Sequence, residues 1–132
     1  MFTLHPQLER DSFFVASLEL SQLLLINNAL FPWLVLVPRA PEARELIDLQ
    51  DGARHQLMDE ISLVSRCMQS LFAPDKLNIA ALGNQVPQLH IHVIARFAKD
   101  AAWPHPVWGK GNEPYTDPKP FIDRLKKEFK AS

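Results

Sequence analysis

One long helical face constrains the fold of this chain more than any other feature. From Asp51 onward, apolar side chains recur at intervals of three and four residues, which is the spacing of one face of an α-helix. These apolar positions are Leu57, Ile61, Val64, Met68, Leu71 and Phe72. Pro74 ends the segment, because proline cannot continue a helix. A helix with such a face has to bury it against other elements, and strands are the candidates.

Strand-like runs lie on both sides of this helix in the sequence. Before it, residues 18–26 and 33–37 are rich in branched apolar side chains and are separated by an asparagine-containing turn, which predicts a hairpin. After it, residues 76–82 and 88–96 form two further runs, joined by a turn that contains glycine, asparagine and proline. The order of strands, long helix and strands favours an antiparallel sheet with helices packed on it.

Both ends of the chain predict further helices. Pro6 suits the first turn of a short helix. A terminal helix is expected from about Pro118, with Phe121, Leu125 and Phe129 on its apolar face. The fold class is therefore α+β, and a chain of 132 residues is expected to form a single domain over residues 1–132.

Composition excludes several classes of protein. Hydrophobic residues make up 47% of the chain and charged residues 22%, which is typical of a folded domain and not of a disordered one. Fourteen Lys and Arg against fifteen Asp and Glu give a formal charge of -1, so no nucleic-acid partner is expected and any phosphate has to be held locally. Cys67 is the one cysteine and falls within the apolar helix, which indicates a buried thiol.

The apolar runs do not predict an exported or membrane protein. The N-terminal residues lack a basic segment followed by an apolar core and a cleavage site. No apolar run approaches the roughly 18 residues of a membrane span. We expect a cytoplasmic protein with no membrane partner.

Residues 88–96 contain the side chains that are the best candidates for a functional site. The period of two in a strand sends Gln88, His90 and His92 to one face. The alternate residues Leu89, Ile91 and Val93 would face the core. A row of one amide and two imidazoles needs a ligand or a hydrogen-bond network to satisfy it, so this row is the candidate functional site.

This segment, Gln-Leu-His-Ile-His-Val-Ile, resembles the signature of the histidine triad family, His-φ-His-φ-His-φ-φ, where φ is apolar. Gln88 stands in the place of the first histidine. Residues 24–39 look like the leading hairpin of the family and residues 78–84 like its strand before the triad, so that the resemblance covers roughly residues 18–110. It implies a five-stranded antiparallel sheet and a homodimer, with a nucleotide lying over each triad strand.

The resemblance also implies a reaction. Carried over to this sequence, His90 would attack the α-phosphorus of a nucleotide to give a nucleotidyl-histidine that water resolves, and His92 would contact the phosphate oxygens. The substrate class would be a dinucleoside polyphosphate or a nucleoside phosphoramidate, with no cofactor and no metal. Neutral imidazole is a good nucleophile near pH 7 if its attacking nitrogen is bare. The other ring nitrogen of His90 should then donate to a backbone carbonyl near Gln88.

Other residues are candidates for binding the nucleotide. The Asn84 side chain and the backbone amides of the turn from Gly83 to Gln85 could donate to phosphate oxygens. Asn27 and Asn28 end a strand where the family places a side chain against the ribose, and Asn28 is the preferred match. Both asparagines could equally be turn residues, which is a common place for asparagine.

Two positions depart from the family pattern. Gln88 can donate and accept hydrogen bonds but cannot carry a proton charge, which argues against acid catalysis at this position. Trp33 stands where several members have a further histidine, which would shorten the chain of hydrogen bonds behind the nucleophile, and its indole is expected to pack. His5 and His55 are expected on the surface. His105 lies between two tryptophans and is a candidate outer residue of the site.

Two other functions remain open. Two histidines spaced by one residue could bind zinc in a hydrolase, although no Asp or Glu occurs between residues 76 and 99 to complete the site. The substitutions at Gln88 and Trp33 would also suit a module that binds a nucleotide without turnover.

Overall fold

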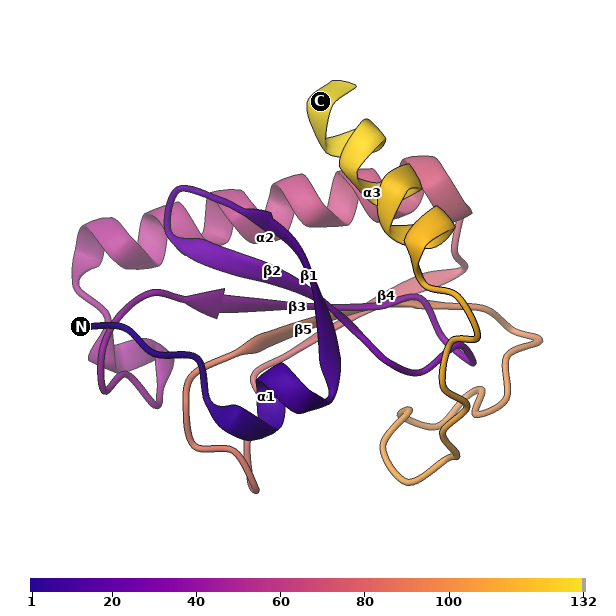
Figure 1. Cartoon of the computed structure of the whole chain (residues 1–132), viewed down its shortest axis with the longest axis horizontal. Coiled ribbons are helices and arrows are strands. Elements are labelled where there is room, and N and C mark those ends of the chain that lie inside the picture. The colour runs from indigo at the N-terminus through magenta and orange to yellow at the C-terminus, as the bar shows by residue number, and fades with distance from the viewer. Residues whose placement is uncertain (132) are drawn as a thin grey trace.

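Five antiparallel strands form one sheet in the order β1-β2-β3-β5-β4. We describe residues 1–131 from a computed structural model (Figure 1). The strands are β1 (Ser12–Ser17), β2 (Ser21–Ile26), β3 (Trp33–Pro38), β4 (Lys76–Ala80) and β5 (Ile91–Arg96). The helices are α1 (Pro6–Arg10), the 3-10 turn η1 (Leu46–Asp48), α2 (Asp51–Phe72) and α3 (Lys119–Ala131). The expected α+β class with a five-stranded antiparallel sheet is confirmed.

Helix α2 covers one face of the sheet. Its buried side chains Leu57, Val64 and Met68 share one core cluster with the strand residues Ile91 and Val93. Cys67 on the same helix is buried, as expected. The helix ends where Ala73 takes a left-handed backbone conformation, directly before Pro74. The apolar period of the sequence therefore identified the helix correctly.

The other face of the sheet carries a second, separate core cluster. It includes Trp33 and Val35 of β3, Ile94 of β5, and Leu8 of α1. Helix α1 therefore lies on the side of the sheet opposite to α2 (Figure 1). Because neighbouring residues of β5 point to opposite faces, His92 lies on the α1 side, between Ile91 and Val93 of the α2 side.

One strand and several strand boundaries differ from the sequence-based expectation, including the end of β4 at Ala80 instead of residue 82. Strand β1 was missing from the sequence-based assignment, because it is a half-buried edge strand whose register shifts between Phe14 and Ala16 and so breaks a regular alternation. Residues 18–20 form a turn instead of starting β2. Strand β5 begins at Ile91, so residues 88–90 precede it and do not follow a strand period.

No helix within residues 1–131 combines the length and the apolar character that crossing a bilayer requires.

Candidate active site

Two buried imidazoles stand side by side where β5 begins. His90 and His92 are each 5% exposed, and their ring centroids are 4.8 Å apart. The Nδ1–H of His90 donates to the main-chain oxygen of Gln88 at 2.6 Å. The expected carbonyl acceptor for His90 is therefore confirmed. With its proton on Nδ1, the neutral ring leaves Nε2 unprotonated, and no group of residues 1–131 is hydrogen-bonded to that nitrogen.

His92 has a different environment, because both of its ring nitrogens are occupied. Its Nδ1 accepts from the indole N–H of Trp33 at 2.9 Å, and its Nε2–H donates to the main-chain oxygen of Leu82 at 3.0 Å. The expected contact of His92 with phosphate oxygens does not fit this arrangement, since no ring nitrogen is left to make it. Trp33 also does more than pack, because its indole N–H is a hydrogen-bond donor to His92.

Burial keeps both imidazoles neutral. Burial lowers the pKa of His90 below its usual value, against the opposing effect of the hydrogen bond to Gln88. Burial lowers the pKa of His92 to about 4, with a smaller contribution from nearby His90. At neutral pH the His90 ring is therefore in its nucleophilic form.

A groove passes over both imidazoles. Its inner part is a cavity of about 460 Å³ that is lined by His90, His92 and the turn from Gly83 to Gln85. Its outer part is a hollow of about 340 Å³ at the ends of β2 and the residue 107–112 segment. The two parts share Asp11, Ile26, Trp33, Trp108 and Gly109, so they form one continuous surface, which we call the groove.

Tryptophan rings form one wall of the groove. The ring of Trp108 meets the ring of His92 edge to face at 5.0 Å and that of Trp33 at 5.6 Å. Such contacts hold the imidazole in a fixed orientation. The sequence had not assigned Trp108 to the site; its only signal was an aromatic residue in a segment rich in proline and glycine.

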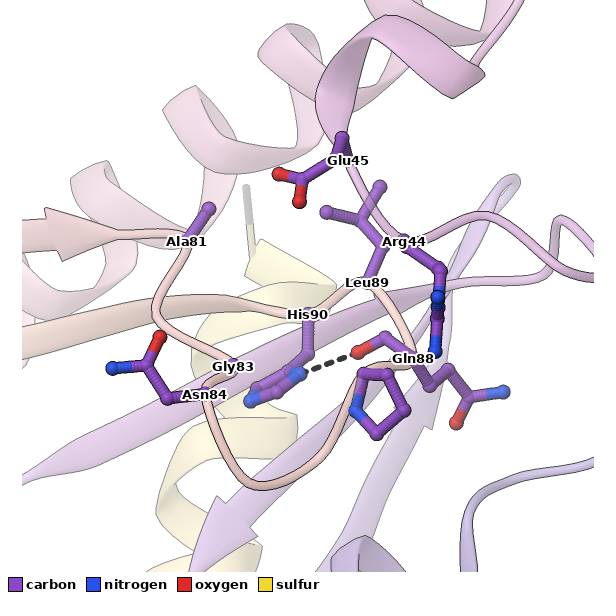
Figure 2. Close-up of a pocket in the computed structure, with 9 residues that line it drawn as sticks. Arg44, Glu45, Ala81, Gly83, Asn84, Gln88, Leu89 and His90 are labelled. Atoms are coloured by element: carbon purple, nitrogen blue, oxygen red, sulfur yellow. Dashed lines mark hydrogen bonds between the residues drawn. The ribbon is translucent and has the colours of Figure 1, made fainter.

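The turn at Gly83 approaches the imidazole of His90 closely. A Cβ atom at Gly83 would lie 2.6 Å from the main-chain oxygen of Val86 and 3.1 Å from Cε1 of His90, so only glycine fits. Asn84 and Gln85 are exposed and line the cavity beside His90. Figure 2 shows Gly83 and Asn84 on one side of the imidazole and the hydrogen bond to Gln88 on the other. The structure thus brings the expected turn and His90 together.

A further cavity of about 240 Å³ borders His90 (Figure 2). It shares Gly83 and Asn84 with the groove and adds Arg44 and Gln88. Arg44 was not singled out from the sequence, where it is one of many charged residues in a loop.

The two asparagines after β2 line the outer groove, and their side chains are hydrogen-bonded to the neighbouring loop segments. Asn28 is 4% exposed, its Oδ1 accepts from the N–H groups of Leu30 and Glu113, and its Nδ2 donates to the oxygen of Gly111. Asn27 accepts from the N–H of Tyr115. Both residues line the outer part of the groove. These bonds fix the segment that follows Gly111 and use one of the two hydrogens on Nδ2 of Asn28, so the expected ribose contact stays a prediction.

Of the remaining expected residues, Gln88 contacts the imidazole pair through its main-chain oxygen, and the other histidines lie apart from the pair. Gln88 does not share a strand face with His92; its side chain bonds to the backbone of Thr3 and His5. His5 is half-buried and caps α1 by accepting from the N–H of Gln7, so it is not the plain surface residue that was expected. His55 is exposed, as expected. The imidazole of His105 is also exposed and takes no part in the imidazole pair.

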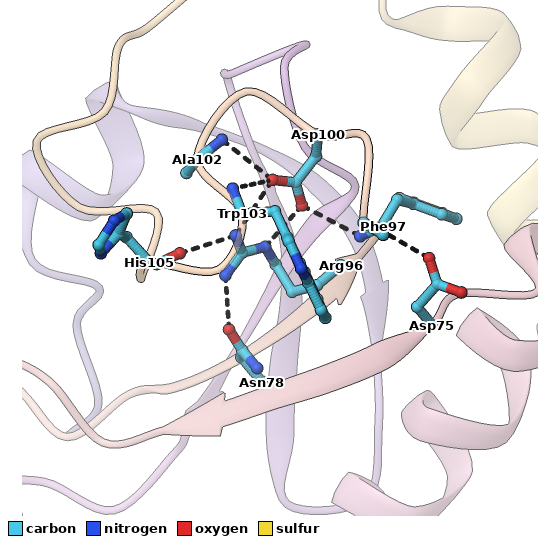
Figure 3. Close-up of polar contacts among 9 residues, drawn as sticks. Asp75, Asn78, Arg96, Phe97, Asp100, Ala102, Trp103 and His105 are labelled. Atoms are coloured by element: carbon cyan, nitrogen blue, oxygen red, sulfur yellow. Dashed lines mark hydrogen bonds and ion pairs between the residues drawn. The ribbon is translucent and has the colours of Figure 1, made fainter.

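A buried ion pair fixes the segment that carries Trp108. Arg96 and Asp100 are 2% and 4% exposed in their side chains, and Nε of Arg96 is 2.8 Å from Oδ2 of Asp100. Arg96 also donates to Asn78 and to the main-chain oxygen of His105 (Figure 3). The guanidinium beside Asp100 holds the pKa of that carboxyl well below its usual range. The sequence carried only a weak signal of this pair, an arginine and an aspartate four residues apart.

Within the described residues 1–131, no three His, Cys, Asp or Glu side chains gather in a way that could hold a metal ion.

Comparisons with known proteins agree with this geometry. The family model of the HIT domain matches residues 7–99. A histidine triad protein from Bradyrhizobium japonicum is 49% identical, with a TM-score of 0.94 over 97% of this chain and 98% of that one. A histidine triad protein from Marinobacter aquaeolei VT8 is 41% identical, with a TM-score of 0.95 over 99% and 98%. One from Sinorhizobium meliloti 1021 is 40% identical, with a TM-score of 0.93 over 96% of each chain.

The comparison with curated proteins gave no match. The family match covers well over half of the chain, and the similarity to the three solved structures extends over nearly all of it. The chain therefore belongs to the HIT domain family, the histidine triad proteins.

Proposed function

We propose that this protein binds a nucleotide in the groove and cleaves a bond at its α-phosphorus with His90 as the nucleophile. The observation that carries the proposal is the buried, neutral imidazole of His90, which is held by Gln88 through Nδ1 and leaves Nε2 bare in a cavity. An imidazole whose function is purely structural usually has both nitrogens satisfied, as His92 does.

The reaction has two displacements. In the first, the Nε2 lone pair forms a bond to phosphorus, and the leaving group departs with the electron pair of the bond that breaks. The Nδ1–H stays on the ring and donates to Gln88, which stabilises the positive charge that the ring gains. In the second, a water oxygen bonds to phosphorus, the electron pair of the N–P bond returns to Nε2 so that neutral His90 is restored, and the proton that water loses passes to the departed leaving group or to solvent. Splitting one difficult step into two easier ones is the advantage of covalent catalysis.

The residues around His90 suit a phosphate. The backbone N–H groups of the turn from Gly83 to Gln85 and the amide of Asn84 are donors beside the ring. The rest of the nucleotide would lie in the outer groove, where Ile26 and Trp108 offer apolar surface to a base. Substrates of the dinucleoside polyphosphate or nucleoside phosphoramidate class have such a phosphate next to a nucleoside, so they fit a site with a polar part at His90 and an apolar part in the outer groove. His92 is held by its bonds to Trp33 and to the main-chain oxygen of Leu82, and we do not assign it a contact with phosphate.

Turnover by variants tests the proposal. Dinucleoside polyphosphates and nucleoside phosphoramidates are assayed with the wild type, His90→Ala and the matched control His55→Ala on the exposed side of α2. Loss of a nucleophile costs several orders of magnitude, so His90→Ala should turn over at least about 1,000-fold more slowly while still binding nucleoside monophosphate. The His55→Ala rate should equal that of the wild type. A His90→Ala rate above about a tenth of the wild-type rate would contradict covalent catalysis.

We also propose that two copies of the chain form a homodimer through β4. This strand lies at the edge of the sheet and presents unpaired backbone groups. Beside it, an apolar cleft of about 310 Å³ is lined by Met58 of α2 and Ile79 of β4, which are 60% and 47% exposed. A backbone edge next to exposed apolar side chains suits an isologous contact.

Sedimentation at micromolar concentration tests the dimer. The wild type should sediment as a dimer, and Ile79→Lys should sediment as a monomer, because a buried charge opposes association. The control is Phe14→Lys, which changes an equally exposed residue on the opposite edge strand and should leave the dimer intact. A monomeric wild type would contradict the proposal.

A further inference from the structure

The side chain of Gln88 holds the N-terminal segment by two hydrogen bonds. Its Oε1 accepts from the main-chain N–H of His5 at 2.8 Å, and its Nε2 donates to the main-chain oxygen of Thr3 at 2.9 Å. One amide therefore satisfies a carbonyl and an N–H that lie two residues apart, as a residue of a neighbouring parallel strand would. The segment is bound across more than 80 residues of sequence.

The main chain of the same residue holds the nucleophile. The oxygen of Gln88 accepts from Nδ1–H of His90 at 2.6 Å, which fixes the tautomer with a bare Nε2. Gln88 is thus bonded to the N-terminal segment through its side chain and to His90 through its backbone. No other residue described above makes hydrogen bonds to both.

The N-terminal segment leads directly into a wall of the groove. His5 precedes α1, and Gln7 and Leu8 of that helix line the cavity with His90. Arg10 and Asp11 line the outer hollow. A helix of five residues is not stable in isolation, so α1 depends on its attachments to the rest of the molecule. These attachments include the buried Leu8 side chain, the hydrogen bond from the N–H of Asn27 to the oxygen of Asp11 at the end of α1, and the bonds from Gln88 before its start.

We propose that Gln88 is a positioning residue that latches the N-terminal segment and so places α1 as a wall of the groove. The first position of the triad has a mechanical task here in place of proton transfer. The inference rests on the proposed function only for the nature of the groove's occupant, a nucleotide.

The geometry explains why glutamine occupies this position. The oxygen and nitrogen of a carboxamide lie on the same end of the side chain and can meet the two backbone groups together. The two nitrogens of a histidine ring point away from each other and could meet only one of them. A glutamate would keep the bond to the N–H of His5 but would set a carboxylate oxygen against the oxygen of Thr3. Gln88→His should therefore weaken the site, not restore a full triad.

Amide hydrogen exchange tests the latch without reference to activity. In the wild-type full chain, the N–H of His5 should be protected, as should those of Glu9 and Asp11, which bond within α1. Gln88→Leu should raise exchange at these three amides about ten-fold, since two hydrogen bonds are lost, and leave the amides of β3 and β5 unchanged. Gln88→Glu should give a smaller change. The control Gln69→Glu, on the exposed surface of α2, should give none.

A pair of variants at His5 isolates the bond itself. The φ of His5 is -58°, which proline adopts, so His5→Pro removes the donor N–H with little backbone change. His5→Ala removes the imidazole cap but keeps that N–H. His5→Pro should exceed His5→Ala in its effect at Glu9 and Asp11, and Gln88→Leu should have a smaller effect when added to His5→Pro than on its own, because only the bond to Thr3 is then left to lose.

Steady-state kinetics with a nucleotide substrate tests the consequence for the groove. Gln88→Leu should raise KM about ten-fold and change kcat less than three-fold, because the backbone oxygen that holds His90 remains. An unprotected His5 amide in the wild type, or a Gln88→Leu variant with unchanged exchange at α1, would overturn the latch. Loosened α1 amides with an unchanged KM would overturn its role in the groove. If the wild type bound no nucleotide, the proposed function would fail, while the exchange data would still decide the latch.

Discussion

The two ends of β5 both bury polar groups, yet they bury them in different ways. At the start of the strand, two imidazoles are neutral, and one nitrogen, Nε2 of His90, has no partner among residues 1–131. At its end, Arg96 and Asp100 stay charged and are surrounded by partners, with four hydrogen bonds from the guanidinium and five to the carboxylate.

This difference indicates that the start of β5 can take part in a reaction and that its end has a structural role. A buried polar group with all of its hydrogen-bond partners in place rigidifies its surroundings. A buried polar group that has an unpaired nitrogen facing a cavity is available to a ligand. Arg96 and Asp100 hold the segment that carries Trp108 onto the imidazole pair, so the closed end of the strand supports the open one. Substitutions at the two ends of β5 should therefore differ in their effects on stability and on its pH dependence.

The largest expected effect on stability is at the closed end. Arg96→Met keeps the volume of the side chain but leaves the Asp100 carboxylate buried without its cation, so the free energy of unfolding should fall by about 3–5 kcal/mol. Denaturant unfolding measures it. The matched control is Lys119→Met, which breaks the exposed pair with Asp123 and should cost under about 0.5 kcal/mol. Equal losses in the two variants would show that burial of the pair does not matter.

The second effect is a pH dependence at the open end. The pKa of His92 is about 4 in the folded chain and 6.5 in the unfolded one, so between these values the unfolded chain binds a proton that the folded chain does not. The free energy of unfolding should therefore be highest above pH 6.5 and should fall by up to about 3 kcal/mol as the pH drops to 4. The lowered pKa of His90 acts in the same direction.

Unfolding at pH 7.5 and pH 4.5 measures this dependence. His92→Gln removes the titrating ring, so the difference between the two pH values should shrink relative to the wild type by most of that amount. A variant that lost as much stability on acidification as the wild type would show that His92 is not held neutral by the fold.

The smallest expected effect concerns the hydrogen bond from the indole N–H of Trp33 to Nδ1 of His92. Trp33→Phe keeps an aromatic ring in the core but removes the N–H that His92 accepts, leaving a buried acceptor unsatisfied, so we expect a loss of about 1–3 kcal/mol. Trp103→Phe is the control, because Trp103 is 39% exposed. Its cost should be under about 0.5 kcal/mol. A Trp33→Phe variant as stable as the control would mean that the indole only packs.

Sequence periodicity was sufficient for the elements that bury one regular face. Helix α2 and strands β2 to β5 follow from their apolar spacing, and the turn at Gly83 follows from its composition. Strand β1 did not, because an edge strand with a register shift has no clean alternation. The acceptor for His90 could also be predicted, since the nucleophile needs one fixed tautomer.

The parts of the site that escaped prediction depend on contacts between distant segments. The identity of Gln88 says what it can bond to but not that residues 3 and 5 lie beside it. Asn28 looked equally suited to a ribose and to a turn, and only the course of residues 111–113 decides how its amide is used. The role of His92 likewise depends on where Trp33 and the oxygen of Leu82 come to lie.

The central claim is that His90 becomes covalently bound to the nucleotide, and intact-protein mass spectrometry tests it most directly. The wild type and the variants His90→Ala and His92→Gln are mixed with a nucleoside phosphoramidate and quenched within milliseconds to seconds. We expect a mass increase of one nucleoside monophosphate residue on the wild type, mapped to His90, a smaller amount on His92→Gln, and none on His90→Ala. Turnover by the wild type without any adduct at His90, or an adduct of equal amount on His90→Ala, would contradict it.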